Sequence, residues 1–472
     1  MADFRPILVL QMQRMGDLIL SFPLFLWLER QFPGHPIWVV AEASFSEQLR
    51  PLSPAATYFP WSGVDFLRRE SFHLILNLSI RPEAARLAYD LTAEEKFGPL
   101  AGPSGGRGGP VYIRGDWQLY RASVVKNNRH NQFHWTDLNA LDVIDRARMA
   151  TTCYDAPRIL DPSVRKVGVF FGASEESKRP VVQFWQVLLN ELLHRGLEPV
   201  LLGGPAEEPM AWEILRGFGG PVQNACGGMS LTELAALTQT LALFITPDTG
   251  PMHLAAWAGA RVLNLSMGNV NAWETGPYAP GHFVLSTRAS CSGCWECRHA
   301  YPYCQWKFTP KRVAFLAGRI VAGDERGLSS LRMPGVTLFR TARNPAGLYH
   351  LDTLGKEGPA GRRLLSDFWT RFFAWRFGVC DETHGRLAFA ELAQACPDLA
   401  ESFRAALPGL ARRLSLEMSR GGLSPAFHRQ AQPMLRPLTG YLELFLPNAD
   451  NSPAAGRQAL GLVEMLTAMT AD

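Results

Sequence analysis

The residues of this chain best suited to chemistry lie at positions 245–256, in the sequence ITPDTGPMHLAA. An apolar run precedes them and a helix-compatible segment follows, so the pattern predicts a strand, a tight turn and a helix start. Asp248 or Thr249 can cap this helix, and Pro251 suits its first turn, where a missing N–H costs nothing. The free N–H groups and the helix dipole favour an anion. We therefore expect a phosphate-bearing ligand here, within reach of His253.

A carboxylate follows the first predicted strand, residues 7–10. Asp17 opens a helix predicted over 18–32, and Gly16 before it allows a ligand close to the backbone. Asp17 could face a ligand cleft or could only cap the helix, and its position alone favours the cap. The turn is no dinucleotide-binding loop, because it lacks the Gly-x-Gly-x-x-Gly spacing.

Two further predicted strands end in charged turns. After the strand at 167–171, Ser174 and Lys178 could hold phosphate oxygens, with the lysine as a point charge. A solvated basic loop explains the same residues equally well. After the strand at 199–202, Glu207 could accept sugar hydroxyls, as acidic residues do for ribose in Rossmann sites, or could stabilise a helix N-terminus.

The elements that must position these residues form two alternating series, one over 7–155 and one from residue 164. Apolar strands alternating with amphipathic helices predict parallel sheets. Ligands bind such sheets at the carboxyl ends of the strands, so we expect the site in a cleft between two units. The predicted fold is α/β, with two Rossmann-like doubly wound units at 1–158 and 159–325 and a mainly helical extension at 326–472.

Details of three segments add to this prediction. Residues 98–110 hold six Gly and three Pro, which predicts a loop. A hairpin is expected near 338–351, at the start of the extension. The segment 231–240 is a predicted helix whose Ser230 and Glu233 form a capping box.

Composition limits the class of protein. The chain has 472 residues, 47% hydrophobic and 19% charged, with a net charge of +4. Such a weakly basic balance suits an anionic small ligand and does not indicate a nucleic-acid partner. The apolar stretch at 18–28 is too short to span a bilayer, and no signal-peptide cleavage site follows it. We expect a cytoplasmic protein, whose eight cysteines are then not a disulfide framework.

Five motifs occur in a fixed order: Arg14-x-Gly16-Asp17, Gly172-Ala173-Ser174-x-x-x-Lys178-Arg179, Gly203-Gly204-x-x-Glu207, Asp248-Thr249-Gly250-Pro251-x-His253 and Gly276-Pro277-Tyr278. Together, over about residues 5–323, they resemble glycosyltransferase family 9, the ADP-heptose:lipopolysaccharide heptosyltransferases. The resemblance implies a GT-B fold. It also implies inverting, metal-independent transfer of a sugar from a nucleotide-diphosphate donor to a saccharide or glycolipid acceptor such as lipopolysaccharide core, without a cofactor.

The resemblance also assigns roles to residues. It implies that Asp17 is the catalytic base, with Arg14 and Gly16 on the acceptor side. The donor would be held by the following residues: Ser174, Lys178, Glu207, Asp248, Thr249, Gly250 and His253. The loop at 267–272 replaces the family's Phe-Gly-Pro-Thr, and the Trp of Lys-Arg-Trp-Pro is missing after Arg179. Both departures lie near the donor and bear on which sugar is carried.

Alternatives remain at the level of function and of single segments. A nucleotide-sugar epimerase, or a binding module without catalysis, could use the same fold. Cys291, Cys294, Cys297 and Cys304 could hold a structural metal, although reduced thiols in a surface loop are the favoured interpretation. The segment 362–377 is rich in aromatic and Arg residues, which indicates a core helix or, less strongly, a helix lying on a membrane.

Three residues of the first unit are candidates for contact with an acceptor. His134, Trp135 and Asp137 lie where GT-B enzymes bind acceptors, and internal packing explains them equally well.

Overall fold

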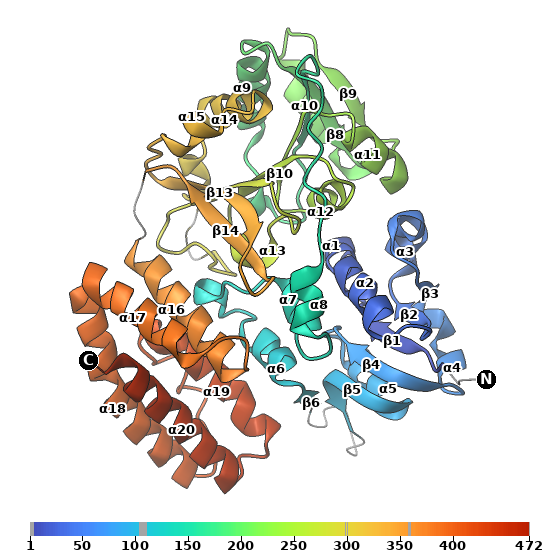
Figure 1. The fold of residues 1–472 in the computed structure, drawn as a ribbon. Coiled ribbons are helices and arrows are strands. Elements are labelled where there is room, and N and C mark those ends of the chain that lie inside the picture. The colour runs from blue at the N-terminus through green and yellow to red at the C-terminus, as the bar shows by residue number, and fades with distance from the viewer. Residues whose placement is uncertain (1–3, 103–110, 298, 300, 357–359, 472) are drawn as a thin grey trace.

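Two parallel-dominated sheets and a group of C-terminal helices make up the protein (Figure 1). The computed structural model describes residues 4–102, 111–297, 299, 301–356 and 360–471. Helices cover both faces of each sheet, and the two sheets belong to separate units that meet along a central line. The predicted α/β fold with two doubly wound units is confirmed.

The first sheet has the strand order β3-β2-β1-β4-β5-β6, parallel except for β6. Its central strand, ILVL, is buried on both faces, as a parallel strand between helical layers must be. The strands are β1 (Ile7–Leu10), β2 (Ile37–Val40), β3 (Thr57–Phe59), β4 (Ser71–Asn77), β5 (Thr92–Ala101) and β6 (Val111–Arg114). The helices are α1 (Met15–Ile19), α2 (Phe22–Gln31), α3 (Ala43–Leu49), α4 (Val64–Leu67), α5 (Pro82–Asp90), α6 (Asp116–Ser123), α7 (Trp135–Ala140) and α8 (Arg146–Thr151).

The helix predicted over 18–32 is divided in two, which corrects that expectation. The Ser21 hydroxyl donates to the backbone oxygen of Asp17 at 2.9 Å, and the buried Gln11 amide donates to the same hydroxyl at 3.1 Å. Pro23, which has no N–H, then lies in the first turn of α2. As a result α1 is one short turn with Asp17 inside it.

The second sheet has the order β14-β13-β12-β11-β10-β7-β8-β9. Its strands are β7 (Lys166–Phe170), β8 (Glu198–Gly203), β9 (Gln223–Cys226), β10 (Leu243–Pro247), β11 (Val262–Ser266), β12 (Phe283–Thr287), β13 (Val336–Arg343) and β14 (Tyr349–Leu354). The helices are α9 (Val182–Leu193), α10 (Glu208–Arg216), α11 (Leu231–Thr238), α12 (Gly250–Trp257), α13 (Ala272–Thr275), α14 (Pro310–Val321) and α15 (Glu325–Ser329). The predicted capping box at the start of α11 is present.

Two expectations about segments change. The predicted hairpin is the pair β13–β14, but β13 pairs antiparallel with β12, so the hairpin extends the second sheet and the helical part begins only after it. The predicted loop at 98–110 is wrong at its start, because Gly98–Ala101 pairs with β6 as part of β5. Residues 103–110 of that prediction lie outside the described residues.

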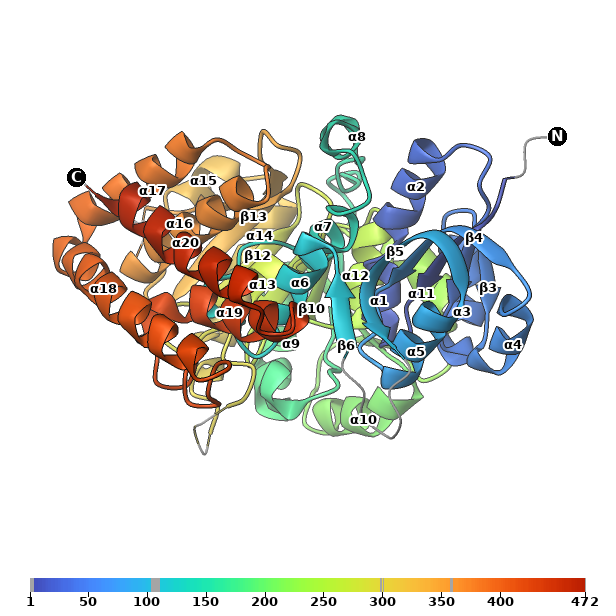
Figure 2. The ribbon, with the colours of Figure 1, turned by 90° about the horizontal axis from the view of Figure 1, so that it is seen from below.

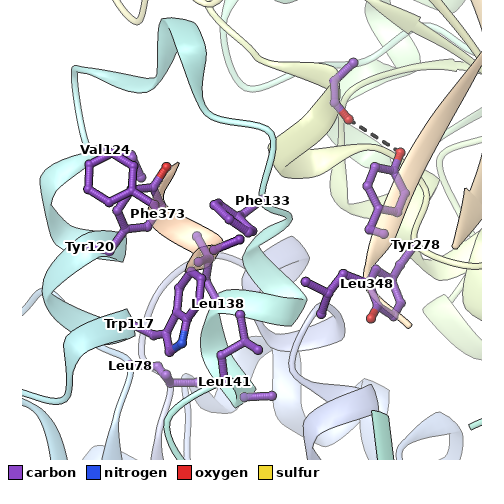
Figure 3. Packing of buried hydrophobic residues seen from close by; sticks show 14 of the residues in the cluster. Leu78, Trp117, Tyr120, Val124, Phe133, Leu138, Leu141, Tyr278, Leu348 and Phe373 are labelled. Carbon is purple, nitrogen blue, oxygen red and sulfur yellow. Dashed lines mark hydrogen bonds between the residues drawn. The ribbon is translucent and has the colours of Figure 1, made fainter. Parts of the chain in front are cut away.

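The C-terminal helices return to the first unit. They are α16 (Gly361–Arg376), α17 (Glu382–Ala395), α18 (Pro397–Ser419), α19 (Arg436–Asn448) and α20 (Pro453–Thr470). The Asn448 side chain accepts from the backbone N–H of Ile113 and donates to its carbonyl oxygen, at 2.5 and 3.0 Å. Phe373 packs on Tyr120 with ring centroids 4.6 Å apart, beside Phe133 (Figure 3). Seen from below, α19 lies across α6 (Figure 2).

The aromatic face of α16 is in the core. Phe368, Trp369, Phe372 and Phe373 are all buried, which supports the core interpretation of segment 362–377 and leaves these rings unavailable to a membrane surface. Among the helices of the described ranges, none is both long and apolar enough to cross a bilayer.

Substitution of Trp369 should strongly lower the stability of the helical extension. Its side chain is 1% exposed, and its indole N–H donates to the Met434 carbonyl at 2.9 Å. We expect Trp369→Ala to lower the free energy of unfolding by about 3–5 kcal/mol, because it leaves a cavity and an unpaired carbonyl. Urea denaturation measures this change. Trp212→Ala is the matched control, since Trp212 is 60% exposed. Equal losses in the two variants would contradict the expectation.

Candidate functional site

The starts of α1 and α12 meet where the two units face each other (Figure 1). A Cβ on Gly250 would lie 3.5 Å from the Gly16 nitrogen and would collide with the end of the Met15 side chain. A Cβ on Gly16 would lie 3.2 Å from Cδ2 of His253. Glycine at both positions therefore lets the turns after β1 and β10 approach closely. This contact brings Asp17 and His253 into one site, as the sequence predicts.

Asp17 lies in the first turn of α1, among positive groups. One carboxylate oxygen accepts from the backbone N–H of Arg14 at 3.2 Å, so the predicted capping contact is present. Burial raises the pKa of Asp17, and the Arg14 N–H and the charges of Arg121, Arg14 and Lys178 oppose that rise. Capping the helix is therefore not the only interaction of this carboxylate, because positive charges from both units also act on it.

The basic side chain of Arg14 connects the units across the cleft, and Lys178 lies beside this contact. Arg14 donates to the Ser174 hydroxyl at 3.1 Å and lies 3.7 Å from a carboxylate oxygen of Glu175. Lys178 Nζ lies 3.5 Å from the same oxygen of Glu175. The turn after β7 is thereby tied to the turn after β1, and the ammonium of Lys178 is kept near the cleft.

The turn before α12 holds polar atoms without partners. Thr249 is the N-cap of α12, but its side chain makes no capping bond. Within the described residues, the Thr249 hydroxyl and Nδ1 of His253 are buried and have no hydrogen-bond partner. An unsatisfied buried polar group costs about 1–3 kcal/mol. A ligand that pairs with these atoms would remove that cost.

The charge state of this turn follows from its burial. Burial, and then the charge of Lys178, lower the pKa of His253 to about 3, so the imidazole is neutral. Burial raises the pKa of Asp248, while Lys178 and a hydrogen bond from the Thr275 hydroxyl act to lower it. The turn thus combines a neutral imidazole with the open N-terminus of a helix, and Lys178 acts on it from the turn after β7.

Glu207 lies at the end of β8, in space left by glycine. Its carboxylate accepts from the Gly204 N–H at 2.9 Å, and a Cβ on Gly172 would lie 2.5 Å from Oε1. Glu207 therefore lies at a helix start, as the alternative interpretation expects, and it also accepts a hydrogen bond from the N-cap residue. The binding of sugar hydroxyls by Glu207 stays a prediction.

Sequence reasoning missed a cation of the first unit. Arg121, on α6, donates to the carbonyl of Leu78 at 3.1 Å and lies over the Trp135 ring at 5.1 Å. Burial lowers its pKa to about 10, and Asp17 acts to raise it. No local motif marks Arg121, because the packing of α6 against β5, β6 and α7 brings it to the site.

The three acceptor-side candidates have internal partners. Asp137 accepts from the Tyr278 hydroxyl at 2.5 Å and from the Tyr349 N–H at 2.8 Å. His134 is fully buried, with Nε2 lying 2.9 Å from the Gly276 oxygen. These contacts join the first unit to the second sheet and support the packing interpretation for both residues. Trp135 lies under Arg121 and so serves the site indirectly.

The cysteine-rich loop supports the turn that carries Lys178. Its four cysteines are free thiols, and no group of three or more His, Cys, Asp or Glu side chains in the described ranges is arranged to hold a metal. Directly after Cys304, the Gln305 amide donates to the carbonyls of Glu176, Ser177 and Arg179 at 3.0, 3.1 and 2.9 Å. The loop thereby fixes the backbone around Lys178.

Comparisons with known proteins identify the family and the fold of this chain. The family model of glycosyltransferase family 9 (heptosyltransferase) matches residues 65–303. A family 9 glycosyltransferase from Veillonella parvula shares 18% identity, covers 68% of this chain and 99% of its own, and gives a TM-score of 0.52. The ADP-heptose lps heptosyltransferase II of E. coli shares 17% identity, covers 68% of this chain and 99% of its own, and gives a TM-score of 0.47. E. coli heptosyltransferase WaaC with ADP shares 15% identity, covers 58% of this chain and 91% of its own, and gives a TM-score of 0.42.

No curated protein matches the chain. The likeness to the Veillonella parvula structure establishes the fold. The family model covers just over half of the chain, including the turns that carry Lys178 and His253. This protein is therefore an enzyme of glycosyltransferase family 9, the heptosyltransferase family.

Proposed function

We propose that the protein transfers a heptose from ADP-heptose to a saccharide acceptor such as lipopolysaccharide core, with inversion at the anomeric carbon and without a metal ion. One observation carries the proposal: Asp17 of the first unit shares a site with Lys178 and the start of α12 from the second. A single displacement needs a base on one side of the sugar and a stabilised leaving group on the other. The two units supply one each.

The reaction proceeds in one step. Asp17 takes the proton of the acceptor hydroxyl as that oxygen forms a bond to the anomeric carbon. The bond from this carbon to the diphosphate oxygen breaks, and its electron pair stays on the diphosphate. Lys178 and the backbone N–H groups at the start of α12 stabilise the charge that develops there. These groups supply positive charge without Mg²⁺, so no cofactor is needed.

The remaining site residues bind and orient. Thr249 and His253 offer their unpartnered polar atoms to the diphosphate and the sugar, beside Asp248 and Gly250. Ser174 holds a phosphate oxygen, and Glu207 accepts the ribose hydroxyls. On the acceptor side, Arg14 and Gly16 shape the approach to Asp17.

The compartment follows from the chemistry of the thiols and the acceptor. The eight cysteines are free, which fits a reducing compartment, and we place the protein in the cytoplasm. A glycolipid acceptor would bring it to the inner face of the membrane. Membership in a glycosyltransferase family disfavours the epimerase and the non-catalytic module considered from the sequence.

A panel of nucleotide sugars tests the donor. A ligand present at 100 times its Kd stabilises the folded protein by about 2.7 kcal/mol. We expect ADP-heptose to raise the melting temperature more than UDP-, GDP- or CMP-linked sugars, and more than ADP alone. A larger shift with another nucleotide sugar would replace ADP-heptose as the donor and would leave the site in place.

Gly268 should control donor binding through the turn that carries Lys178. Its φ is +80°, and an added Cβ would collide with the Ser177 carbonyl oxygen and lie 3.1 Å from the Lys178 nitrogen. We expect Gly268→Ala to raise the KM for the donor by about tenfold or more, because this backbone must move. Gly323→Ala is the matched control, since Gly323 has φ +67° with nothing within 4 Å of its Cβ position. Equal KM values in the two variants would contradict this role.

The pH dependence of transfer should report Asp17 and not His253. Burial raises the pKa of Asp17 above 3.8, and a base must be ionised, so kcat/KM falls as pH falls through this raised value. His253, with a pKa of about 3, stays neutral over the working range. We expect one acid limb that persists in His253→Asn. A limb near pH 6.5 that disappears in His253→Asn would show that the imidazole titrates in its place.

A further inference from the structure

A cavity of about 340 Å³ lies outside the donor site, between the second sheet and the helical extension. Its walls are β12, the hairpin β13–β14, the 3₁₀ turn η3 (Asn128–His130) and the start of α16. Figure 1 shows this hairpin beside α13 and next to α16. Four arginines line the cavity, Arg129, Arg288, Arg362 and Arg363, and none of its lining residues in the described part of the chain is Asp or Glu.

The sheet face that closes this cavity carries three hydroxyl side chains beside Phe339. Leu285 and Leu338 point from β12 and β13 into the hydrophobic core of the second unit. On the other face, Ser286, Thr337 and Thr353 line the cavity. A sheet face covered by a helix is ordinarily apolar, because it must pack against that helix. Hydroxyl groups in these places indicate a wall built for polar contacts.

Arg129 and Arg362 have uncharged hydrogen-bond acceptors. Arg362 donates to the carbonyls of Arg129 and Ser292 at 2.9 and 2.6 Å, and Arg129 donates to the carbonyl of Ser290. These acceptors are uncharged, so they orient the guanidinium groups without neutralising them. Arg363 has a carboxylate nearby, Asp367, at 3.9 Å. Burial and the neighbouring Arg129 lower the pKa of Arg362 to about 10, which shows the cost of its charge there. An anion would offset this cost.

An apolar wall lies beside the arginines. Trp273 and Phe339 both line the cavity, with ring centroids 6.3 Å apart. The guanidinium of Arg363 lies over the Phe339 ring at 5.7 Å. Flat aromatic surfaces next to charged, forked donors suit a ligand with a ring at one end and an anion at the other.

We propose that this cavity binds a phosphorylated saccharide, with its phosphate at Arg129, Arg362 and Arg363 and its sugar ring against Trp273 and Phe339. The cavity is separate from the donor cradle. They share α13, on which the Thr275 hydroxyl contacts Asp248 while Trp273 lines the cavity. Binding here does not depend on the proposed transfer reaction. The ligand is a free sugar phosphate or a phosphorylated residue of a larger glycan, and the phosphate group is common to both.

Calorimetry with mannose 6-phosphate tests the proposal, with excess ADP present to fill the donor cradle. We expect saturable binding, weakened about tenfold or more by Arg363→Gln and by Arg129→Gln, since each removes a charge-assisted contact. Phe339→Leu should weaken mannose 6-phosphate but not inorganic phosphate. Lys178→Met and Arg332→Gln should leave binding of mannose 6-phosphate unchanged, because neither residue lines the cavity. Arg332 is also exposed, so its loss should not disturb the fold.

The outcomes separate the two sites and the two ligand sources. No binding of mannose 6-phosphate or of a phosphorylated oligosaccharide would overturn the proposal, as would binding that only Lys178→Met abolishes. Tighter binding of the oligosaccharide than of mannose 6-phosphate would identify a glycan as the source. Melting temperatures of the variants show that they fold, and Arg363→Lys, which keeps the charge, should recover part of the affinity. Failure to detect any sugar transfer by the protein would not affect the binding measured at this cavity.

Discussion

Asp17→Asn is expected to lower kcat for sugar transfer by about 10²–10⁴-fold, the range usual for loss of a general base. The amide keeps the size of the carboxyl, and its oxygen can still accept the hydrogen bond from the Arg14 N–H. It cannot take a proton from the acceptor hydroxyl. The dissociation constant for the donor should therefore change little, which separates a catalytic role from a binding role. Single-turnover kinetics and calorimetry on the same preparation measure both quantities.

A surface carboxylate provides the control for this experiment. The Asp65 side chain is 92% exposed, so Asp65→Asn should leave kcat and stability unchanged. If Asp17→Asn keeps near wild-type kcat with a demonstrated donor and acceptor, then Asp17 is a helix cap only. In that case another group must receive the proton.

Lys178→Met should have the second largest effect on transfer, because it removes a positive charge that would stabilise the leaving diphosphate. The Lys178 side chain is 15% exposed and acts on the charges of Asp17 and Asp248. Methionine fills similar space without the ammonium group. We expect kcat/KM to fall by about 10²–10³-fold, as in sites that lose one stabilising donor. Affinity for a nucleoside diphosphate should fall more than affinity for the monophosphate if the lysine contacts the leaving phosphate, as we propose.

The comparison needs a lysine that is exposed on the same unit. Lys166 begins β7 and is exposed, so Lys166→Met should leave both affinities unchanged. Equal losses of affinity for mono- and diphosphate in Lys178→Met would show that the lysine supports the loop and not the diphosphate.

Local patterns were enough to predict the central strands and the turns of the site. β1 and β10 are short apolar runs that are buried on both faces, and β10 leads into Pro251 and a helix, a combination with few alternatives. The capping box of Ser230 was predictable because both partners lie within one turn. Asp17 and His253 were placed on facing turns by the rule that ligands bind at the carboxyl ends of parallel strands.

Features that depend on contacts distant in sequence were not predictable. Arg121 acts on Asp17 only because α6 packs on β5, β6 and α7, and nothing near residue 121 records those contacts. Glu274 accepts hydrogen bonds from Asn128 and Asn131 of the other unit, and burial raises its pKa to about 8. The return of α19 onto α6 likewise depends on surface shape. Single-sequence patterns carry local periodicity and do not carry such pairings.

The measurement that tests the central claim most directly is release of nucleoside diphosphate from ADP-heptose, with and without a saccharide acceptor. We predict rapid release of ADP only when lipopolysaccharide core acceptor is present, with one heptose transferred for each ADP and the linkage inverted at the anomeric carbon. Asp17→Asn should abolish this release. ADP release that is equally fast without acceptor, or a product that retains the donor's anomeric configuration, would contradict direct attack by an acceptor activated by Asp17.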